Sequence, residues 1–205
     1  MSTPENPAQQ PADRRTLLAD TAIGLVAAAG LRGLTHRAVD AAAGLPAGST
    51  SYYFRTRTAL IAACYARLAE LDLADLDRDA PLAAQVPADR DAVAAALGAL
   101  LHRWLTVGRE RQLARFELSL EAARNPDLQA DLHQAGLGSR ALAAAVLTAL
   151  GARRPQESAD LMVSWTDGLL YDRLAGALAR SRPAPDRTEL TATVRRMIDA
   201  ALAEP

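Results

Sequence analysis

The sequence is poor in cysteine, aromatic residues and lysine, and each shortage narrows what the chain can be. The single Cys64 excludes an internal disulfide framework, and its place in a helical apolar pattern predicts a buried, unreactive thiol. Aromatic residues make up only 4 % of the chain, while the apolar residues are rich in alanine, the strongest helix former. All basic residues are arginine, which we attribute to genomic base composition. The composition therefore favours an all-α protein.

Long hydrophobic runs are also missing. No apolar run approaches the ~18 residues of a membrane helix, and the opening MSTPENPAQQPAD lacks the basic and apolar stretch of an export signal. We therefore expect a cytoplasmic protein that does not contact a membrane. At 205 residues, the chain is long enough for one large domain or two small ones.

Charge is unevenly distributed along the chain. The net charge of −1 shows no general basic bias. Up to Arg57, however, six arginines stand against four acids, a balance of +2, whereas the remainder has 17 arginines and 20 acids, a balance of −3. The local basic excess thus lies in the N-terminal part, where a polyanionic partner is favoured.

Apolar residues recur at helical spacing from residue 14 onward, and caps and breakers divide this pattern into about nine helices. We expect a disordered arm at 1–13, a head at 14–61 and a larger body at 62–205, with a loop at 78–87. The helices are expected at 14–33, 35–43, 46–54, 56–75, 89–105, 111–123, 126–150 and 155–180, with a last one from Asp186 or Thr188.

Two of these helices, at 35–43 and 46–54, are short and joined by a tight turn at Gly44. This spacing allows the second helix to enter a DNA major groove. Leu45, Thr50 and Phe54 can face the core, which leaves small and hydroxyl-bearing residues on the surface. The surface residues of this helix are Gly48, Ser49, Ser51, Tyr52 and Tyr53.

The run LTHRAVDAAAGLPAGSTSYYFRTRTALIAA, which begins at Leu34, resembles the DNA-binding head of the tetracycline-repressor (TetR) family. The resemblance implies an N-terminal helix-turn-helix head on a helical body that binds a ligand and dimerises. It also implies a regulator, with repression favoured, that binds a palindromic operator and is released by a small-molecule effector. The DNA-contacting residues that it implies are Thr35, Arg37, Gly48, Ser49, Ser51, Tyr52, Tyr53 and Arg57.

Several positions depart from the family pattern. Pro46 and Ala47 replace a frequent serine and lysine, Thr50 stands where leucine packs, and Ser51 stands where tyrosine is common. For this reason, the operator sequence of other family members cannot be transferred to this chain. From how far each side chain can reach towards DNA, we expect phosphate contacts from Thr35, Tyr53 and Arg57. We expect base contacts from Ser49, Ser51 and Tyr52. Arg14 and Arg15 either enter a minor groove or form a solvated pair.

Two copies are needed if the heads are to read a palindrome, because one head covers only a few base pairs. The last two helices suit a four-helix bundle between copies, although the same residues can fill the core of one copy; those of the first helix are Met162, Trp165, Leu169 and Gly176. The resemblance favours the bundle. The residues expected at the dimer interface are Met162, Leu169, Gly176, Val194, Met197 and Ile198.

The resemblance also implies an effector pocket in the body. We expect Trp104, Phe116, Leu120 and Trp165 to bind the ligand, with plain core packing as the alternative for each. Possible polar contacts are Arg115, Glu117, Glu121, His102 and His133, although the charges on the sixth helix also suit a solvated face. The effector is unknown.

No arrangement of residues indicates an enzyme, a cofactor or a metal. The acidic run from Asp75 to Asp79 imitates the start of a calcium loop, but Ala80 and Val86 replace its required glycine and glutamate. We interpret it as a solvated helix end. The three histidines stand far apart in the sequence, which argues against zinc. The alternative to a regulator is a helical ligand-binding or interaction protein that does not bind DNA.

Overall fold

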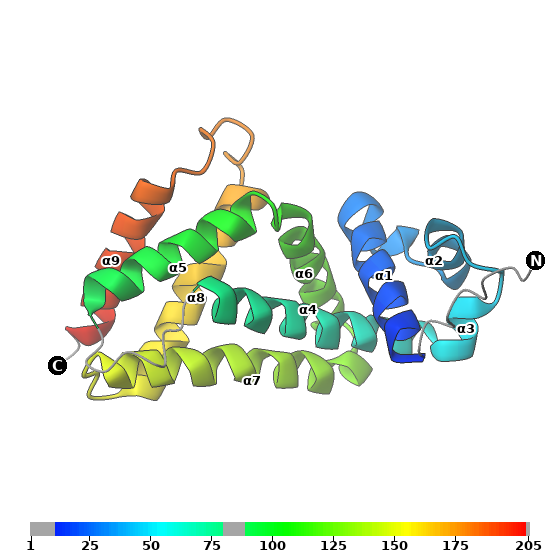
Figure 1. Ribbon diagram of the computed structural model, residues 1–205, viewed down its shortest axis with the longest axis horizontal. Helices are drawn as coiled ribbons and strands as arrows, with labels where there is room; N and C mark the ends of the chain where they lie inside the picture. The colour runs from blue at the N-terminus through cyan, green and yellow to red at the C-terminus, as the bar shows by residue number, and fades with distance from the viewer. Residues whose placement is uncertain (1–10, 80–88, 204–205) are drawn as a thin grey trace, which may run out of the picture.

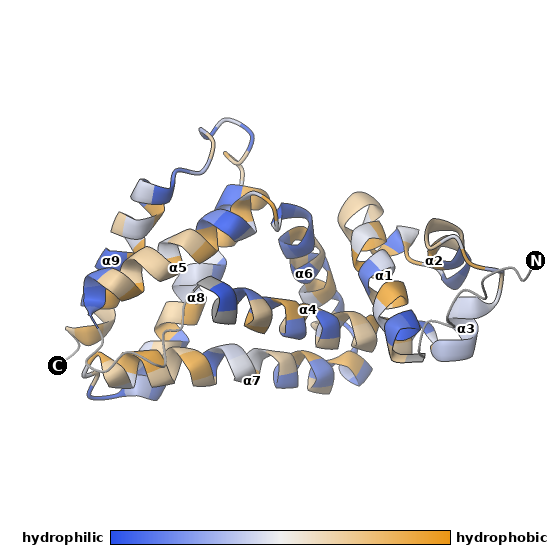
Figure 2. Ribbon diagram, in the orientation of Figure 1, coloured by the Kyte–Doolittle hydropathy of each residue, from blue (hydrophilic) through white to orange (hydrophobic). Residues whose placement is uncertain are grey.

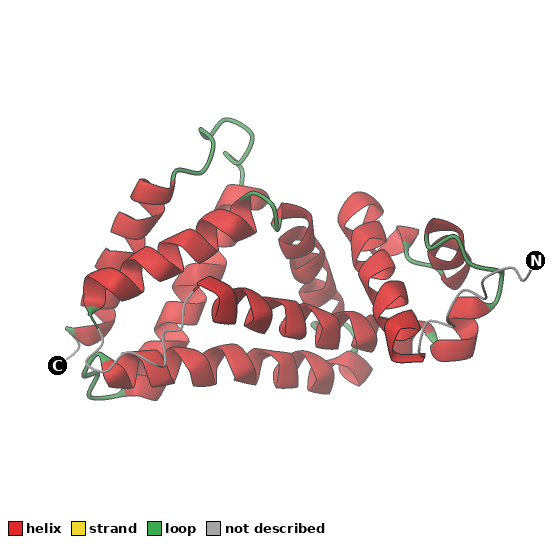
Figure 3. Ribbon diagram, viewed as in Figure 1, coloured by secondary structure: helices red, strands yellow, loops and turns green. Residues whose placement is uncertain are grey.

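The computed structural model describes residues 11–79 and 89–203, and over these ranges it forms nine α-helices and no strand (Figures 1 and 3). The all-α prediction is thereby confirmed. Most of the expected N-terminal arm and of the expected loop lie outside the described residues. The helices are α1 (Pro11–Gly33), α2 (His36–Ala42), α3 (Ser49–Tyr53), α4 (Arg57–Asp79), α5 (Arg90–Leu105), α6 (Arg109–Ala122), α7 (Pro126–Ala149), α8 (Pro155–Leu174) and α9 (Arg187–Leu202).

Local capping signals account for most helix starts. Side chains of four residues accept a backbone N–H at the N-cap of α2, α5, α7 and α9, as the sequence predicts. Thr56 does the same for Ala59 at the start of α4, with a distance of 3.0 Å from N to Oγ1. The four N-cap residues are Thr35, Asp89, Asn125 and Asp186.

Several helix ends differ from expectation. Helix α4 extends to Asp79, past the expected end at Asp75. Helix α1 begins at Pro11, so the last three residues of the expected disordered arm are helical, because proline tolerates the first turn and Asp13 complements the helix dipole there. Helix α8 ends at Leu174 instead of Arg180. A Cβ at Gly176 would lie 2.6 Å from the Asp172 carbonyl oxygen, so the chain turns tightly where a longer helix was expected.

The helices form an elongated body with α1, α2 and α3 at one end, α4, α6 and α7 in the middle, and α5, α8 and α9 at the other end (Figure 1). Apolar and polar residues alternate around the helices, as their periodicity predicts (Figure 2). One core joins the head to α4, α6 and α7, with Leu18, Leu60 and Leu118 fully buried. A second core joins α5, α7, α8 and α9. The expected boundary between head and body at residue 61 therefore does not interrupt the first core.

Residues 12–33 of α1 are long and apolar enough to cross a membrane by length and composition alone. This helix carries charged residues, and Leu18, Ala22 and Val26 are buried against the other helices of the first core. The core helix of a soluble protein has the same length and composition, so these two properties of α1 do not by themselves indicate a membrane span.

Cys64 lies in the first core, fully buried, as the sequence predicts. Burial raises the pKa of its thiol to about 12, and the nearby charge of Asp20 adds to the shift. Because the thiolate is the reactive form, this cysteine is inert at neutral pH.

Candidate DNA-binding face and effector cavity

Helices α2 and α3 form a compact helix-turn-helix at the end of the molecule (Figure 1). Thr35 caps α2 by accepting the Ala38 N–H at 3.1 Å. The chain then turns through Gly44 and Gly48, whose φ angles of 66° and 95° are accessible to glycine at little cost. Helix α3 starts directly after this turn, at Ser49, and not at Pro46 as expected.

A buried carboxylate joins α2 to α3. Asp40 is 3 % exposed and accepts hydrogen bonds from the Gly48 N–H at 2.8 Å, the Thr50 N–H at 2.7 Å and the Thr50 hydroxyl at 2.5 Å. Burial by itself would raise the pKa of Asp40, but these hydrogen bonds outweigh it and lower the pKa. The sequence did not reveal this link, because the partners are eight and ten residues apart.

The residues expected to contact DNA belong to α2, to α3 and to the positions that flank them, and most of them are exposed. Tyr52 is 80 % exposed, whereas Ser49 and Tyr53 are half-buried. The Ser49 hydroxyl donates to the Pro46 carbonyl at 2.6 Å, which leaves its oxygen as an acceptor. Thr50 is fully buried and Phe54 is 4 % exposed, so both face the core as predicted. The exposed members of the set are Thr35, Arg37, Gly48, Ser51, Tyr52 and Arg57.

Two arginines beside this face contact other protein groups. Arg57 Nη2 donates to the Leu31 carbonyl at 2.9 Å, and its Nη1 lies 3.6 Å from Glu121 of α6. The guanidinium of Arg15 lies 5.9 Å from the Tyr53 ring centre and 5.3 Å from that of Phe54, in cation–π range of both. Arg57 therefore ties the head to α6, and Arg15 lies beside the recognition helix.

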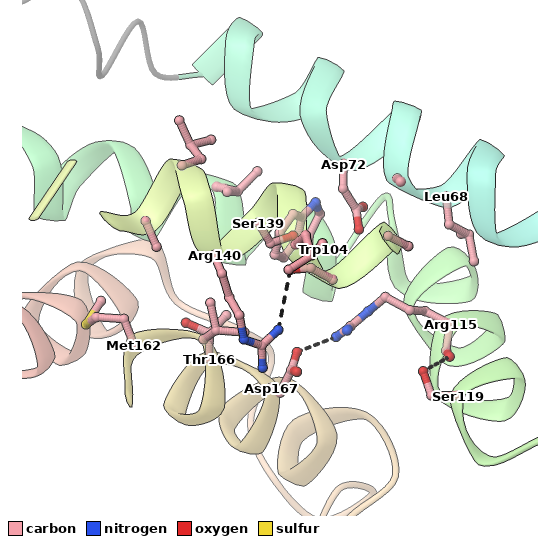
Figure 4. A pocket seen from close by; sticks show the side chains of 18 of the residues that line it. Leu68, Asp72, Trp104, Arg115, Ser119, Ser139, Arg140, Met162, Thr166 and Asp167 are labelled. Carbon is pink, nitrogen blue, oxygen red and sulfur yellow. Dashed lines mark hydrogen bonds and ion pairs between the residues drawn. The ribbon is translucent and has the colours of Figure 1, made fainter. Parts of the chain in front are cut away.

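A cavity of about 740 Å³ lies within the body (Figure 4). Its walls are mostly apolar and come from α4 to α9, with Leu68, Leu97, Trp104 and Met162 among them. Its volume is in the range of small-molecule sites. His133 and Arg140 of α7 also line the cavity, and both are exposed.

Charged side chains from three helices meet at one side of this cavity. Arg115 of α6 donates to Asp167 of α8 at 2.8 Å (Figure 4). Its neighbour Arg111 binds Asp75 of α4 and lies 3.4 Å from Asp72. Asp75 also accepts the Trp104 indole N–H at 3.0 Å, with only 5 % of its surface exposed. The expectation of a solvated helix end at Asp75 is thus wrong, because arginine and tryptophan partners from distant segments satisfy this carboxylate.

Comparison with known proteins identifies the body. Residues 88–200, more than half of the chain, match the family described as the tetracyclin repressor-like C-terminal domain. The chain belongs to the TetR family. It is therefore a DNA-binding transcriptional regulator in the general sense of that family, whose members are regulators and not enzymes. The part of the chain that the structure describes holds no group of three or more His, Cys, Asp or Glu residues suited to a metal.

Solved structures of TetR-type proteins agree with this assignment. The multidrug binding protein EbrR in complex with imidazole aligns at a TM-score of 0.70 and 28 % identity, over 94 % of this chain and 96 % of EbrR. A TetR family member from Streptomyces coelicolor A3 aligns at a TM-score of 0.71 and 27 % identity, over 90 % and 98 % of the two chains. A transcriptional regulator from Rhodococcus sp. Rha1, at 23 % identity, TM-score 0.73 and coverages of 93 % and 99 %, supports the fold. Comparison with curated proteins gives no match.

The cavity of this TetR-family chain contains only part of the predicted ligand set. Trp104 lines it, but Phe116, Leu120 and Trp165 do not. Phe116 packs edge-on against Tyr171 at 5.5 Å, while Leu120 and Trp165 are 53 % and 37 % exposed. Helical periodicity does not reveal which face of a helix meets a cavity, and this explains the error. Of the predicted polar contacts, Arg115 and His133 line the cavity, whereas Glu117, Glu121 and His102 do not.

The predicted dimer set also needs correction. Met162, Val194 and Ile198 are buried inside the chain's own second core and line the cavity, so they are not available to a partner. Leu169 and Met197 are half-buried against the same core. Gly176 lies beyond the end of α8. The outer face of α8 instead carries Leu161, Ser164, Trp165 and Gly168, and that of α9 carries Ala192, Arg196 and Ala200.

The cavity carboxyl Asp72 is expected to make the stability of the chain depend on pH. Burial raises its pKa to about 6, although Arg111 and Arg115 oppose the shift. Because the pKa in the folded chain exceeds the ordinary value of about 3.9, the stability from proton binding is complete below pH ~4 and is lost as the pH rises through about 6. Asp72→Asn, which stays neutral, should therefore be more stable than the wild type by about 2 kcal/mol at pH 8 and no more stable near pH 4.

Urea unfolding of both proteins across this pH range measures the difference directly. Effects of the other titrating groups cancel, because both proteins share them. A difference that stays constant from pH 4 to 8 would contradict the raised pKa.

Proposed function

We propose that the chain is a cytoplasmic homodimer that represses transcription by binding a palindromic operator and leaves it when a small molecule fills the cavity. The observation that carries this proposal is that Thr35, Arg37, Ser51 and Tyr52, at the start of α2 and on α3, are all exposed. A hydroxyl, a cation and an aromatic on one helix-turn-helix surface suit the phosphates and base edges of a major groove.

The role of each residue follows from its position. Thr35 caps α2 with an oxygen lone pair, so its hydroxyl proton stays available to a phosphate. Tyr53 and Arg57 are the other proposed phosphate ligands, while Ser49, Ser51 and Tyr52 on α3 are proposed to touch base edges. Gly48 allows the backbone to come close to the DNA, and Arg37 adds a positive charge on α2. The edge-on contact between Tyr52 and Tyr53, with ring centres 5.1 Å apart, holds the two rings in fixed orientations.

A binding assay with the DNA that flanks the chain's own gene tests this proposal. The expected result is a salt-sensitive complex that requires both halves of a palindrome. A scrambled duplex of the same length is the control. Equal affinity for both duplexes would favour the alternative of a helical ligand-binding or interaction protein.

Arg57→Ala is expected to weaken binding evenly across DNA sequences and to lower the slope of log affinity against log salt by about 1. Arg57 is exposed and has donors left beyond those given to Leu31 and Glu121, so it can still reach a phosphate. Salt titrations of both proteins give the two slopes. Arg153→Ala, which removes the same charge in the segment between α7 and α8, is the control and should leave the slope unchanged. An unaltered slope in Arg57→Ala would contradict the phosphate contact.

The proposed effector is a flat aromatic cation. EbrR has been solved in complex with ethidium, proflavin and malachite green. Here, two carboxyl groups, Asp72 and Asp167, and two arginines, Arg115 and Arg140, line the cavity. Arg115 pairs with Asp167 and Arg140 pairs with Asp160, whereas Asp72 has no short bond to arginine. A ligand cation placed beside Asp72 would pair with this carboxyl group.

Ethidium titration followed by fluorescence tests the effector class. Asp72→Asn is expected to weaken ethidium binding about tenfold or more, the usual effect of losing a charged partner. Binding of the neutral probe N-phenyl-1-naphthylamine should be unchanged, because it depends on the apolar walls. Equal losses for both probes would mean that Asp72 only shapes the cavity.

A further inference from the structure

The recognition helix α3 has only five residues, Ser49–Tyr53. A helix of this length has no stability of its own in water, since isolated helices need ~12 residues or more. Its position relative to α2 must therefore come from tertiary contacts. Two side chains of α2, His36 and Asp40, lie one turn apart on the same face and reach opposite ends of α3.

At the first end, Asp40 acts as the cap that α3 lacks in its own sequence. The N-cap residue of α3 is Gly48, which has no side chain to accept a hydrogen bond. Both oxygens of Asp40 are used, one by the Gly48 N–H and the other by the N–H and hydroxyl of Thr50. The carboxylate is 3 % exposed, so it cannot contact DNA itself.

At the other end, His36 holds the residue that terminates α3. Its Nε2 lies 2.7 Å from the carbonyl oxygen of Phe54, the C-cap of the helix. Because a carbonyl only accepts, Nε2 must carry the proton and donate it. The Phe54 ring is buried in the first core, so this bond adds a fixed polar contact to an apolar anchor.

We propose that His36 and Asp40 are positioning residues. They fix the position of α3 relative to α2 and so determine how well the chain distinguishes its operator from other DNA. This inference depends on the proposed DNA-binding function. The proposed base contacts, Ser49, Ser51 and Tyr52, all lie on α3, whereas two of the three proposed phosphate contacts, Thr35 and Arg57, lie outside it. Loosening α3 therefore removes base readout and leaves most of the attraction to phosphates in place.

The test compares the affinities of each variant for its palindromic operator and for a scrambled duplex of equal length at one salt concentration. Asp40→Asn and His36→Ala are each expected to reduce the ratio of these affinities about tenfold or more, the effect of losing one or two base contacts. Affinity for the scrambled duplex should change by less than about twofold, because it rests on phosphates. His36→Gln, which retains an N–H donor, should recover most of the ratio.

Asp89→Asn is the matched control, since Asp89 caps α5 by accepting the Asp91 N–H at 3.1 Å in the body. It should leave the ratio unchanged. Equal losses of both affinities in Asp40→Asn and His36→Ala, as expected from a smaller folded fraction, would overturn the inference, as would wild-type affinities for both duplexes in these variants. Circular dichroism distinguishes these two results. A wild-type chain without operator preference would overturn the proposed function and this inference with it.

Discussion

Trp165→Arg is expected to convert the proposed homodimer to a monomer and to lower its operator affinity about 100-fold or more. Trp165 is 37 % exposed on the outer face of α8, about one turn from Leu161 and from Gly168. The outer face of α9 carries Ala192 and Ala200 on either side of Arg196, and such small residues allow helices of two copies to cross closely. A charge at the centre of such a face would be buried without a partner.

The loss of affinity follows from the loss of the second head. Two linked heads bind far more tightly than one, typically by a factor of about 10² to 10⁴, without any new contact to DNA. Light scattering measures the mass and a binding titration measures the affinity. Leu73→Arg, at a residue 44 % exposed on α4, is the control for placing arginine on an apolar surface position. A dimer that persists in Trp165→Arg would rule out this face as the interface.

Gly98→Ala is expected to lower the free energy of unfolding by about 3 kcal/mol, the upper part of the usual range for overpacking. A Cβ at Gly98 in α5 would lie 2.4 Å from Thr191 Oγ1 and 2.8 Å from Thr191 Cα in α9. The latter atom is backbone, so α5 and α9 would have to separate along their shared contact. This outweighs the gain of about 1 kcal/mol that alanine normally brings to a helix interior.

Gly24→Ala is the matched control, because Gly24 is also inside a helix and a Cβ there meets no atom within 4 Å. It should raise stability by up to about 1 kcal/mol, so the two glycine substitutions should have opposite signs in thermal or urea unfolding. Stabilisation by Gly98→Ala would show that α5 and α9 are not packed as closely as described.

Features encoded within a few neighbouring residues could be predicted. The caps at Thr35, Asp89 and Asn125 were found, and Asp186 was one of two candidates, because a cap needs only a polar side chain two or three positions before its partner. The fold class followed from periodicity and alanine content. The family followed from one run of residues around α2 and α3, and the match of residues 88–200 supports it independently.

Features that depend on which helix faces lie opposite one another could not be predicted. Met162 and Trp165 sit three residues apart on α8, and the sequence offered both for the bundle between copies and Trp165 also for the cavity. The structure places Met162 in the lining of the cavity and leaves Trp165 37 % exposed on the outside of α8. Both are large and apolar, and only the placement of α8 against α7 and α9 distinguishes them.

The sequence alone thus determined that this chain is helical, where most of its helices start, and that its head is of the TetR type, because these properties arise from local propensity and short motifs. Only the tertiary structure decided that Asp40 and His36 form hydrogen bonds to the two ends of α3, and that Asp75 is buried against Arg111 and Trp104. It also decided which residues line the cavity. The physical reason is that a hydrogen bond between residues 8 to 36 positions apart leaves no periodic trace in the sequence. It exists only once packing has brought the two helices together.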